Sequence, residues 1–304
     1  MNIGIIGTGS MGRTHAASFA RTHARIAGFV TRSGRSALAD EFGAPAFAHL
    51  EDMLPHVDVV DICTPTTQHL AQARAAAAAG KHVICEKPLA RTVADAEAIV
   101  AACEAAGVRL LVAHVLRYFP DYAHARAEVA RGALGEVCEL HLLRAGHLPT
   151  KAHENWFTDL DASGGPLFDL LIHDYDFARW VAGEVVDVQA RSSGGANAHA
   201  FVTLRHASGA VTHIEGGWHL GPGEFRTSLE IVGTLGTLRA SSDARPYDDA
   251  QPQVDPAAVR NPYDLQAQEF YDALAHNAPV RVAPRDGVEA VRIAVAATET
   301  YPSS

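Results

Sequence analysis

The sequence lacks several features that would place it in a membrane or outside the cell. No apolar run approaches the roughly 20 residues that a membrane-spanning helix needs. Residues 1–12 enter an apolar segment at once, without the basic region and cleavage site of a signal peptide. The four cysteines form neither a CxxC pair nor the spacing of a zinc site. We therefore expect a cytoplasmic protein whose thiols are reduced.

Positive charge is also scarce. The chain has 25 Lys and Arg against 35 Asp and Glu, a formal net charge of −10. Nucleic acids and anionic membranes are both negatively charged, so this balance argues against either as a partner. The 304 residues are 48% hydrophobic and 20% charged, which is typical of a globular protein of two domains.

Short apolar runs alternate with helical segments through the first 118 residues. Strands are predicted at 3–6, 25–30, 57–63, 82–85 and 109–113, with helices at 11–21, 36–42, 69–79 and 93–106. Strands that alternate with helices of this length indicate βαβ crossovers and a parallel sheet. We therefore predict an α/β protein whose N-terminal domain, residues 1–118, is a doubly wound Rossmann domain.

A different pattern follows. Short runs of alternating polarity are separated by glycines, which is typical of antiparallel hairpins. Residues 119–304 are therefore predicted to form an α+β domain with a large, mostly antiparallel, open-faced sheet, whose last helix can pack back on the first domain. We expect an exposed apolar face that needs cover, formed by Phe201, Val202, Leu204, Leu229 and Ile231.

A glycine-rich motif lies between the first strand and the first helix. It has the pattern GxGxxG and consists of Gly7, Thr8, Gly9, Ser10, Met11 and Gly12. The pattern alone is weak, but a strand before it and a helix after it are the context of a dinucleotide site. Gly7 permits the tight turn, Gly9 lets the backbone approach a pyrophosphate, and Gly12 allows close packing of helix and strand. A turn without a ligand is the alternative.

The end of the second strand bears on which dinucleotide binds. Thr31, Arg32 and Ser33 stand where an NAD-preferring site usually carries an acid. A guanidinium and hydroxyls suit a 2′-phosphate, which an acid would repel. NADP is therefore favoured over NAD, unless Arg32 is only a solvated loop residue.

Two further motifs follow the third and fourth strands, where ligands of doubly wound sheets bind. The first, CTPTTQH, contributes the candidate cofactor residues Cys63, Thr64, Pro65 and His69. The second, CEKPLA, contributes Glu86 and Lys87. A lysine at the end of a core strand either extends to solvent or serves a bound molecule.

The segments GTGSMG, CTPTTQH, GKHVICEKPLA and SGGPLFDLLIHDYD occur together and in this order. In this respect the chain resembles the Gfo/Idh/MocA family of NAD(P)-dependent oxidoreductases over nearly its whole length. The resemblance implies hydride transfer between NAD(P) and a hydroxyl or keto carbon of a sugar, polyol or related cyclic alcohol. It also implies a homodimer or homotetramer formed through the C-terminal sheet.

The resemblance further implies roles for single residues. Lys87, Asp169 and His173 match the family's catalytic positions and would also contact the substrate. His173 would take a proton from the hydroxyl, Asp169 would orient the imidazole, and Lys87 would stabilise charge on the oxygen. Asp169 and His173 are four residues apart, so on one helix they would share a face.

Arg117 matches an arginine near the cofactor of related proteins, although Val115 departs from the asparagine that many of them carry. Trp156 precedes the DxxxH motif and is expected to wall the substrate pocket, unless it is an ordinary half-buried indole.

Two alternatives remain. Asp169, His173 and Asp176 have helical spacing and could ligate a metal, but no further histidine or cysteine completes a site, so we predict none. The chain could also be a non-catalytic dinucleotide-binding regulator of the same fold, although a regulator needs none of the three catalytic residues.

Overall fold

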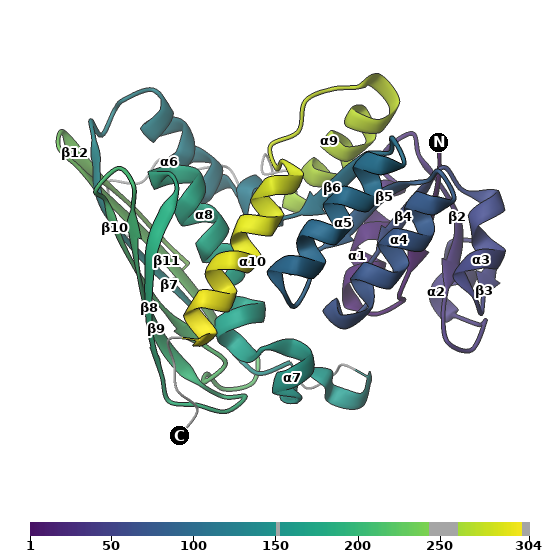
Figure 1. Cartoon of the computed structure of the whole chain (residues 1–304), viewed down its shortest axis with the longest axis horizontal. Helices are drawn as coiled ribbons and strands as arrows, with labels where there is room; N and C mark the ends of the chain where they lie inside the picture. Colours follow the sequence, from purple (N-terminus) through teal and green to yellow (C-terminus); the bar gives the residue numbers. More distant parts are fainter. Residues whose placement is uncertain (150–152, 243–260, 300–304) are drawn as a thin grey trace. The chain divides into compact units, whose positions relative to one another are not determined.

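The computed structural model describes residues 1–149, 153–242 and 261–299. The chain divides into two compact units. One consists of Met1–Tyr118 and Arg260–Val288, and the other of Phe119–Val259 and Glu289–Ser304. Each unit has its own six-stranded sheet (Figure 1).

The sheet of the first unit is parallel throughout, with the strand order β3-β2-β1-β4-β5-β6. Its strands are β1 (Asn2–Ile6), β2 (Arg25–Val30), β3 (Ala46–Phe47), β4 (Val59–Ile62), β5 (His82–Glu86) and β6 (Leu110–Ala113). The predicted Rossmann sheet is thereby confirmed. The strand order reverses between β1 and β4, and ligands of such sheets bind beyond the strand ends at this reversal.

Helices accompany this sheet along the chain. They are α1 (Ser10–Phe19), α2 (Ala37–Glu41), α3 (Leu50–Met53), α4 (His69–Ala78), α5 (Val93–Ala105), α9 (Pro262–His276) and the first turn of α10 (Pro284–Glu299), which belongs to the second unit from Glu289 onward. Short 3₁₀ turns lie at Leu54–His56, Thr66–Gln68 and Val115–Tyr118. Side chains cap three of these helices: Ser36 accepts the N–H of Leu38, Thr92 that of Asp95, and Asn261 that of Tyr263.

Helix α9 completes the core of the first unit although it lies far along the chain. Phe270 is buried in one hydrophobic cluster with residues of β1 and α1, among them Ile3 and Phe19. Burial of a phenylalanine side chain contributes about 1.5–3 kcal/mol. The guanidinium of Arg109 adds a hydrogen bond of 2.5 Å to the carbonyl of Ala273.

The sheet of the second unit has the order β12-β11-β7-β10-β9-β8. Its strands are β7 (Val137–Gly146), β8 (Val185–Ser192), β9 (His199–His206), β10 (Val211–Gly217), β11 (Phe225–Gly233) and β12 (Gly236–Ser241). Only the pairing of β10 with β7 is parallel among the described strands of this sheet. The predicted, mostly antiparallel sheet is confirmed.

The helices α6 (Pro120–Ala130) and α8 (Ile172–Ala182) cover one face of the second sheet (Figure 1). Four of the five apolar residues expected on an exposed face are buried under this cover: Val202, Leu204, Leu229 and Ile231. Phe201 alone is on the open face, where 54% of it is exposed. Polar residues of β7 and β10 share this open face, including His141, His213 and Glu139.

The expectation of an exposed apolar face was therefore wrong. Neighbouring residues of a strand point to opposite faces of the sheet, so Phe201 and Val202 cannot lie on one face. The chain's own helices already cover the apolar side.

The part of the chain that the structure describes contains no helix with both the length and the hydropathy of a membrane span.

Candidate functional site

The glycine-rich loop connects β1 to α1, and two of its glycines are required by the fold itself. Gly7 has φ +94°, and a Cβ there would lie 2.7 Å from the carbonyl oxygen of Cys63. A Cβ on Gly12 would lie 2.0 Å from the carbonyl oxygen of Gly7. Any side chain at either position would displace the backbone of a neighbouring segment.

Gly9 is different. Its backbone is extended, with φ −75° and ψ −161°, a conformation that any residue adopts. Among the described residues, no atom comes within 4 Å of a Cβ built on it. Neither strain nor packing within the chain therefore requires glycine here, whereas the close approach of a ligand would.

The beginning of α1 is suited to an anion. Gly9 is the N-cap, and in the described part of the chain no side chain hydrogen-bonds to this cap. The first turn, which begins with Ser10 and Met11, contains no acidic residue. The N–H groups of the first turn and the positive end of the helix dipole together favour a phosphate. The loop thus fits the pyrophosphate of a dinucleotide.

The loop after β2 is folded around the carbonyl of Arg35. The hydroxyls of Thr31 and Ser33 both donate to this oxygen, at 3.0 and 3.1 Å. Arg32 and Arg35 are exposed. Both hydroxyl protons are thus engaged within the loop. The donors that remain for a phosphate are the guanidinium groups of the two arginines.

His69 connects the loops after β4 and β5. Its Nε2 lies 2.9 Å from the carbonyl oxygen of Thr64, and its Nδ1 lies 3.0 Å from that of Pro88. The side chain is completely buried, and burial lowers its pKa. A side chain without exposed surface has no direct contact with a bound cofactor. This position differs from the predicted cofactor contact and indicates that His69 fixes the two loops.

Cys63, Thr64 and Pro65 follow β4, and each is half-buried. The hydroxyl of Thr64 donates to Gln72 of α4 at 2.6 Å. Gly7 faces the carbonyl of Cys63, so this segment lies beside the glycine-rich loop. The structure thus brings the candidate residues after β1 and β4 together.

Lys87 follows β5 directly and is half-buried, and its peptide bond to Pro88 is cis. Its backbone N–H donates to Oε2 of Glu86 at 3.0 Å. The other carboxylate oxygen of Glu86, Oε1, lies 3.0 Å from Nε2 of His15. Glu86 is itself buried, so its carboxylate lies in the protein interior and not on a surface that a cofactor would contact.

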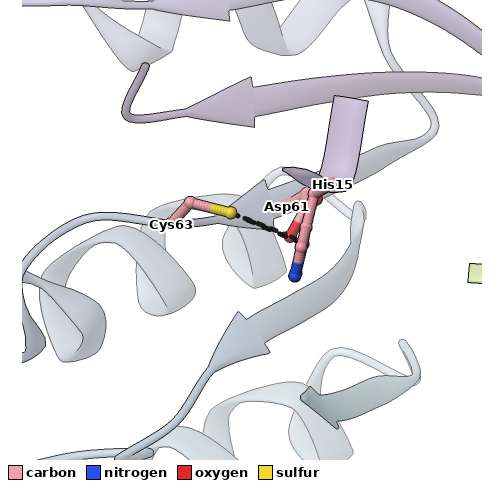
Figure 2. A group of neighbouring side chains, drawn as sticks. All are labelled: His15, Asp61 and Cys63. Atoms are coloured by element: carbon pink, nitrogen blue, oxygen red, sulfur yellow. Dashed lines mark hydrogen bonds and ion pairs between the residues drawn. The ribbon is translucent and has the colours of Figure 1, made fainter. Parts of the chain in front are cut away.

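His15 of α1 joins Asp61 of β4 and Cys63 in a group that the sequence analysis missed (Figure 2). The Nδ1 of His15 lies 2.9 and 3.1 Å from the two carboxylate oxygens of Asp61. Cys63 Sγ lies 3.5 Å from the same nitrogen. With Glu86, these residues form what we call the His15 cluster. Its residues come from α1 and from the ends of β4 and β5.

Two signals in the sequence point to the His15 cluster. Asp61 is a charged residue within the apolar run VVDIC, and a charge in a buried strand needs a partner. His15 lies three residues after Gly12, so the two share the helix face that packs on the sheet. With seventeen histidines in the chain, the sequence alone did not single out His15.

The cluster carries charge in the interior. Burial lowers the pKa of His15, but the negative charge of Asp61 and the hydrogen bond to it prevail, and the pKa is raised well above its usual range. Burial raises the pKa of Glu86, but His15 and the adjacent Lys87 lower it further than burial raises it. Burial raises the pKa of Cys63 to about 12, so it is a neutral thiol.

Arg117 is buried in the first unit. Its guanidinium donates to the carbonyl of Arg281 at 2.6 Å and to Oδ2 of Asp286 at 3.1 Å. The neighbouring Tyr118 donates its hydroxyl to Glu269 at 2.6 Å. These bonds attach the segment after β6 to the C-terminal part of the unit. Arg117 therefore has a structural role within the first unit, and its place near the cofactor stays a prediction.

Asp169 and His173 lie in the second unit, on two different helical elements. Asp169 is in a π-helical turn, Pro166–Leu170, closed by a hydrogen bond of 2.9 Å from the N–H of Leu171 to the carbonyl of Pro166. His173 lies in the first turn of α8 and is half-buried. The expectation that one α-helix carries both residues was wrong, because the chain is wound more widely here.

The beginning of α8 is held against the second sheet. Asp174, next to His173, forms two hydrogen bonds with Arg144 of β7, at 2.7 and 3.2 Å. Tyr175 donates its hydroxyl to the carbonyl of Leu167 at 2.9 Å, which attaches α8 to the π-helical turn. Both contacts limit the movement of His173.

Trp156 lies in a 3₁₀ helix, His153–Thr158, and is half-buried. Its ring stacks on Phe157 at 4.3 Å between centroids, and Phe157 meets the buried Trp218 edge to face at 5.5 Å. Trp156 thus belongs to an aromatic cluster of the second unit, and its part in a substrate pocket stays a prediction.

Comparison with known proteins identifies both halves of the chain. Residues 1–114 match the model of an oxidoreductase family with an NAD-binding Rossmann fold. Residues 122–239 match the GFO/IDH/MocA C-terminal domain. The two matches do not overlap: the first contains all strands of the first sheet, and the second contains β7 to β11 and most of β12.

Single relatives match over most of their length. An inositol 2-dehydrogenase of Saccharopolyspora erythraea is 30% identical, over 97% of this chain and 92% of that protein. The levoglucosan dehydrogenase of Pseudarthrobacter phenanthrenivorans is 28% identical, over 90% of this chain and 83% of that protein. Among solved structures, GenD2 from gentamicin A biosynthesis in complex with NAD has a TM-score of 0.88 at 26% identity, covering 99% of this chain and 93% of that one.

Proposed function

Because the chain belongs to the Gfo/Idh/MocA family of NAD(P)-dependent oxidoreductases, we propose that it transfers hydride between a nicotinamide cofactor and a hydroxyl- or keto-bearing carbon of a sugar, polyol or related cyclic alcohol. The observation that carries the proposal is Gly9, a glycine that a ligand requires and the fold does not. The substrate class is supported by relatives named for inositol and levoglucosan.

The residues fit the cofactor. The backbone from Gly7 to Gly12 and the first turn of α1 would hold the pyrophosphate. The segment Cys63, Thr64 and Pro65 would border the nicotinamide half. When bound, the nicotinamide supplies or accepts the hydride.

We favour NADP over NAD. The loop after β2 contains no carboxylate from Thr31 to Ser36, and it presents the exposed Arg32 and Arg35. A guanidinium binds phosphate through several charge-assisted hydrogen bonds. The hydroxyls of Thr31 and Ser33 donate to Arg35, so the guanidinium of Arg32 would carry most of the preference.

The chain's own residues would move the proton and stabilise charge. His173 would accept the proton of the substrate hydroxyl during oxidation and return it during reduction. Asp169 would orient the imidazole and stabilise its protonated form. The ammonium group of Lys87 would stabilise the negative charge that develops on the substrate oxygen. These roles rest on the match of the three residues to the family's motifs.

We retain two further proposals from the sequence. Pairing of two or four copies through the open face of the second sheet would cover Phe201, and light scattering of the purified protein measures the number of copies. A cytoplasmic location agrees with the four free cysteines.

A panel of sugars, polyols and cyclic alcohols tests the proposal directly. Each compound is supplied with NAD and with NADP, and absorbance of the reduced nicotinamide is followed. Turnover of one class, faster with NADP, is the expected result. Tight cofactor binding without turnover of any compound would contradict the enzyme assignment and favour a regulatory protein.

A further inference from the structure

His15 lies between two buried carboxylates. Its Nδ1 faces Asp61 at 2.9 Å, and its Nε2 faces Glu86 at 3.0 Å. The exposed fractions of the three side chains are 3%, 0% and 6%. Three arrangements satisfy such a group: a metal ion held by the donors, a proton on each ring nitrogen, or a neutral imidazole beside one protonated carboxyl group.

The donors favour the protons over a metal. Nδ1 of His15 is within hydrogen-bonding distance of both oxygens of Asp61, at 2.9 and 3.1 Å, and so faces a carboxylate and not an open coordination position. The third donor atom, Cys63 Sγ, would have to become a thiolate to bind a metal, whereas burial raises its pKa to about 12. With two carboxylates 2.9 and 3.0 Å from its nitrogens, His15 has a raised pKa and Glu86 a lowered one, which favours an imidazolium between two carboxylates.

Glu86 connects this charge to Lys87. One of its oxygens faces His15, and the other accepts the backbone N–H of Lys87 at 3.0 Å. A buried carboxylate without a cation would take up a proton or turn away, because an isolated charge in the interior is costly. The first change would make the acceptor for the N–H of Lys87 neutral and weaker, and the second would remove it.

We propose that His15 is a positioning residue, which holds Glu86 in place and through Glu86 fixes the backbone at Lys87. The inference rests on the proposed function of Lys87 at the substrate oxygen. It also connects the helix that follows the glycine-rich loop with the residue that follows β5. The cluster thus sets the position of a catalytic group from the interior of the first unit.

The test uses the single variants His15→Gln and Glu86→Gln and the double variant. His206→Gln is the matched control, because His206 is buried with both ring nitrogens bonded, but in the second unit. If His15 acts through Glu86, each single variant lowers kcat by about 10- to 100-fold, the loss expected from a misplaced group. The kcat of the double variant is then no lower than that of the less active single variant. The Kd of NAD(P)H changes by no more than roughly twofold, as for an independent site.

A second readout needs no substrate. The chain has only three lysines, Lys81, Lys87 and Lys151, so reductive ¹³C-methylation gives three lysine signals and that of the N-terminus in an NMR spectrum. Lys87→Arg identifies the signal of Lys87. We expect His15→Gln and Glu86→Gln to shift this signal and leave that of Lys81 in place, while His206→Gln shifts neither.

The outcomes separate the inference from the proposed function. A shifted Lys87 signal in a protein that turns over no substrate would refute the function and support the positioning role. Additive losses in the double variant, or a Lys87 signal unmoved by both substitutions, would overturn the inference. If His15→Gln does not fold, the isosteric Asp61→Asn replaces it, with a smaller shift of the Lys87 signal expected and an unmoved signal counting against the inference.

Discussion

Arg144 of β7 holds Asp174 of α8 through two parallel hydrogen bonds, from Nε to Oδ2 at 2.7 Å and from Nη2 to Oδ1 at 3.2 Å. The second nitrogen also donates to the hydroxyl of Tyr122 at 3.1 Å. The exposed fractions of the Arg144 and Asp174 side chains are 5% and 0%. Because Asp174 follows His173 in the chain, this pair sets the position of the proposed base.

Removal of one partner of this pair should destabilise the protein strongly. Arg144→Met leaves the carboxylate of Asp174 buried and unpaired, which costs about 3–5 kcal/mol. Unfolding in urea measures the loss. Glu184→Gln is the control, since it removes the exposed partner of Arg179 at the other end of α8 and costs about 0–1 kcal/mol. Similar losses in both variants would show that the buried pair has no special importance.

Gly9→Ala should separate binding from folding. The new Cβ meets no described atom of the chain within 4 Å, so stability should fall by no more than the roughly 1 kcal/mol that alanine costs at an N-cap. The same methyl group would obstruct the pyrophosphate, so the Kd of NAD(P)H, measured by fluorescence, should rise at least about tenfold, a cost of 1.4 kcal/mol.

Gly12→Ala should instead impair folding. Its Cβ would lie 2.0 Å from the carbonyl oxygen of Gly7, so the protein should lose stability even without cofactor. An unchanged cofactor affinity in Gly9→Ala would contradict the assignment of this loop to the pyrophosphate.

Arg32→Ala should weaken NADP far more than NAD. Loss of hydrogen bonds to a charged phosphate costs about 1.5–3 kcal/mol, roughly 10- to 150-fold in Kd. NAD lacks the 2′-phosphate and should lose little. Thr31→Val is the control, because the hydroxyl of Thr31 donates to the backbone carbonyl of Arg35 and is not available to the phosphate. Parallel losses for both cofactors in Arg32→Ala would refute the preference for NADP.

The raised pKa of His15 predicts a pH-dependent contribution to stability. A group whose folded pKa exceeds the unfolded value of about 6.5 stabilises most below that value and loses its contribution as the pH rises through the folded pKa. The free energy of unfolding of the wild type should therefore exceed that of His15→Gln most at about pH 6. The difference should shrink as the pH rises. The thiol of Cys63, with a pKa of about 12, does not titrate in this range. A difference that grows with pH would mean that His15 is neutral in the folded protein.

The first unit could be predicted from local patterns because each of its main strands is a continuous apolar run followed by a helix. β3 has two residues and α3 has four, so neither is long enough to show a periodic pattern of apolar residues. Helix α9 could not be assigned to this unit, since its contacts with β1 and α1 join residues far apart in the chain.

The candidate site was predictable at its motifs but not in its interior. The positions of Gly7, Gly9 and Gly12 follow from the spacing of one turn. The winding at Asp169 does not, because a π-helical turn and an α-helix both place residues four apart near one another. Asp61 and His15 meet only after β1 and β4 pair, so no local pattern brings them together.

Turnover of the preferred substrate by Lys87→Ala and His173→Ala, with the Kd of the cofactor determined in parallel, tests the central claim most directly. We predict that His173→Ala lowers kcat by roughly 10²–10⁴-fold, the contribution of a general base. Lys87→Ala should also lower kcat, by loss of charge stabilisation, and His173→Ala should leave the affinity for NAD(P)H unchanged. Wild-type kcat in either variant would remove that residue from the mechanism and contradict the account.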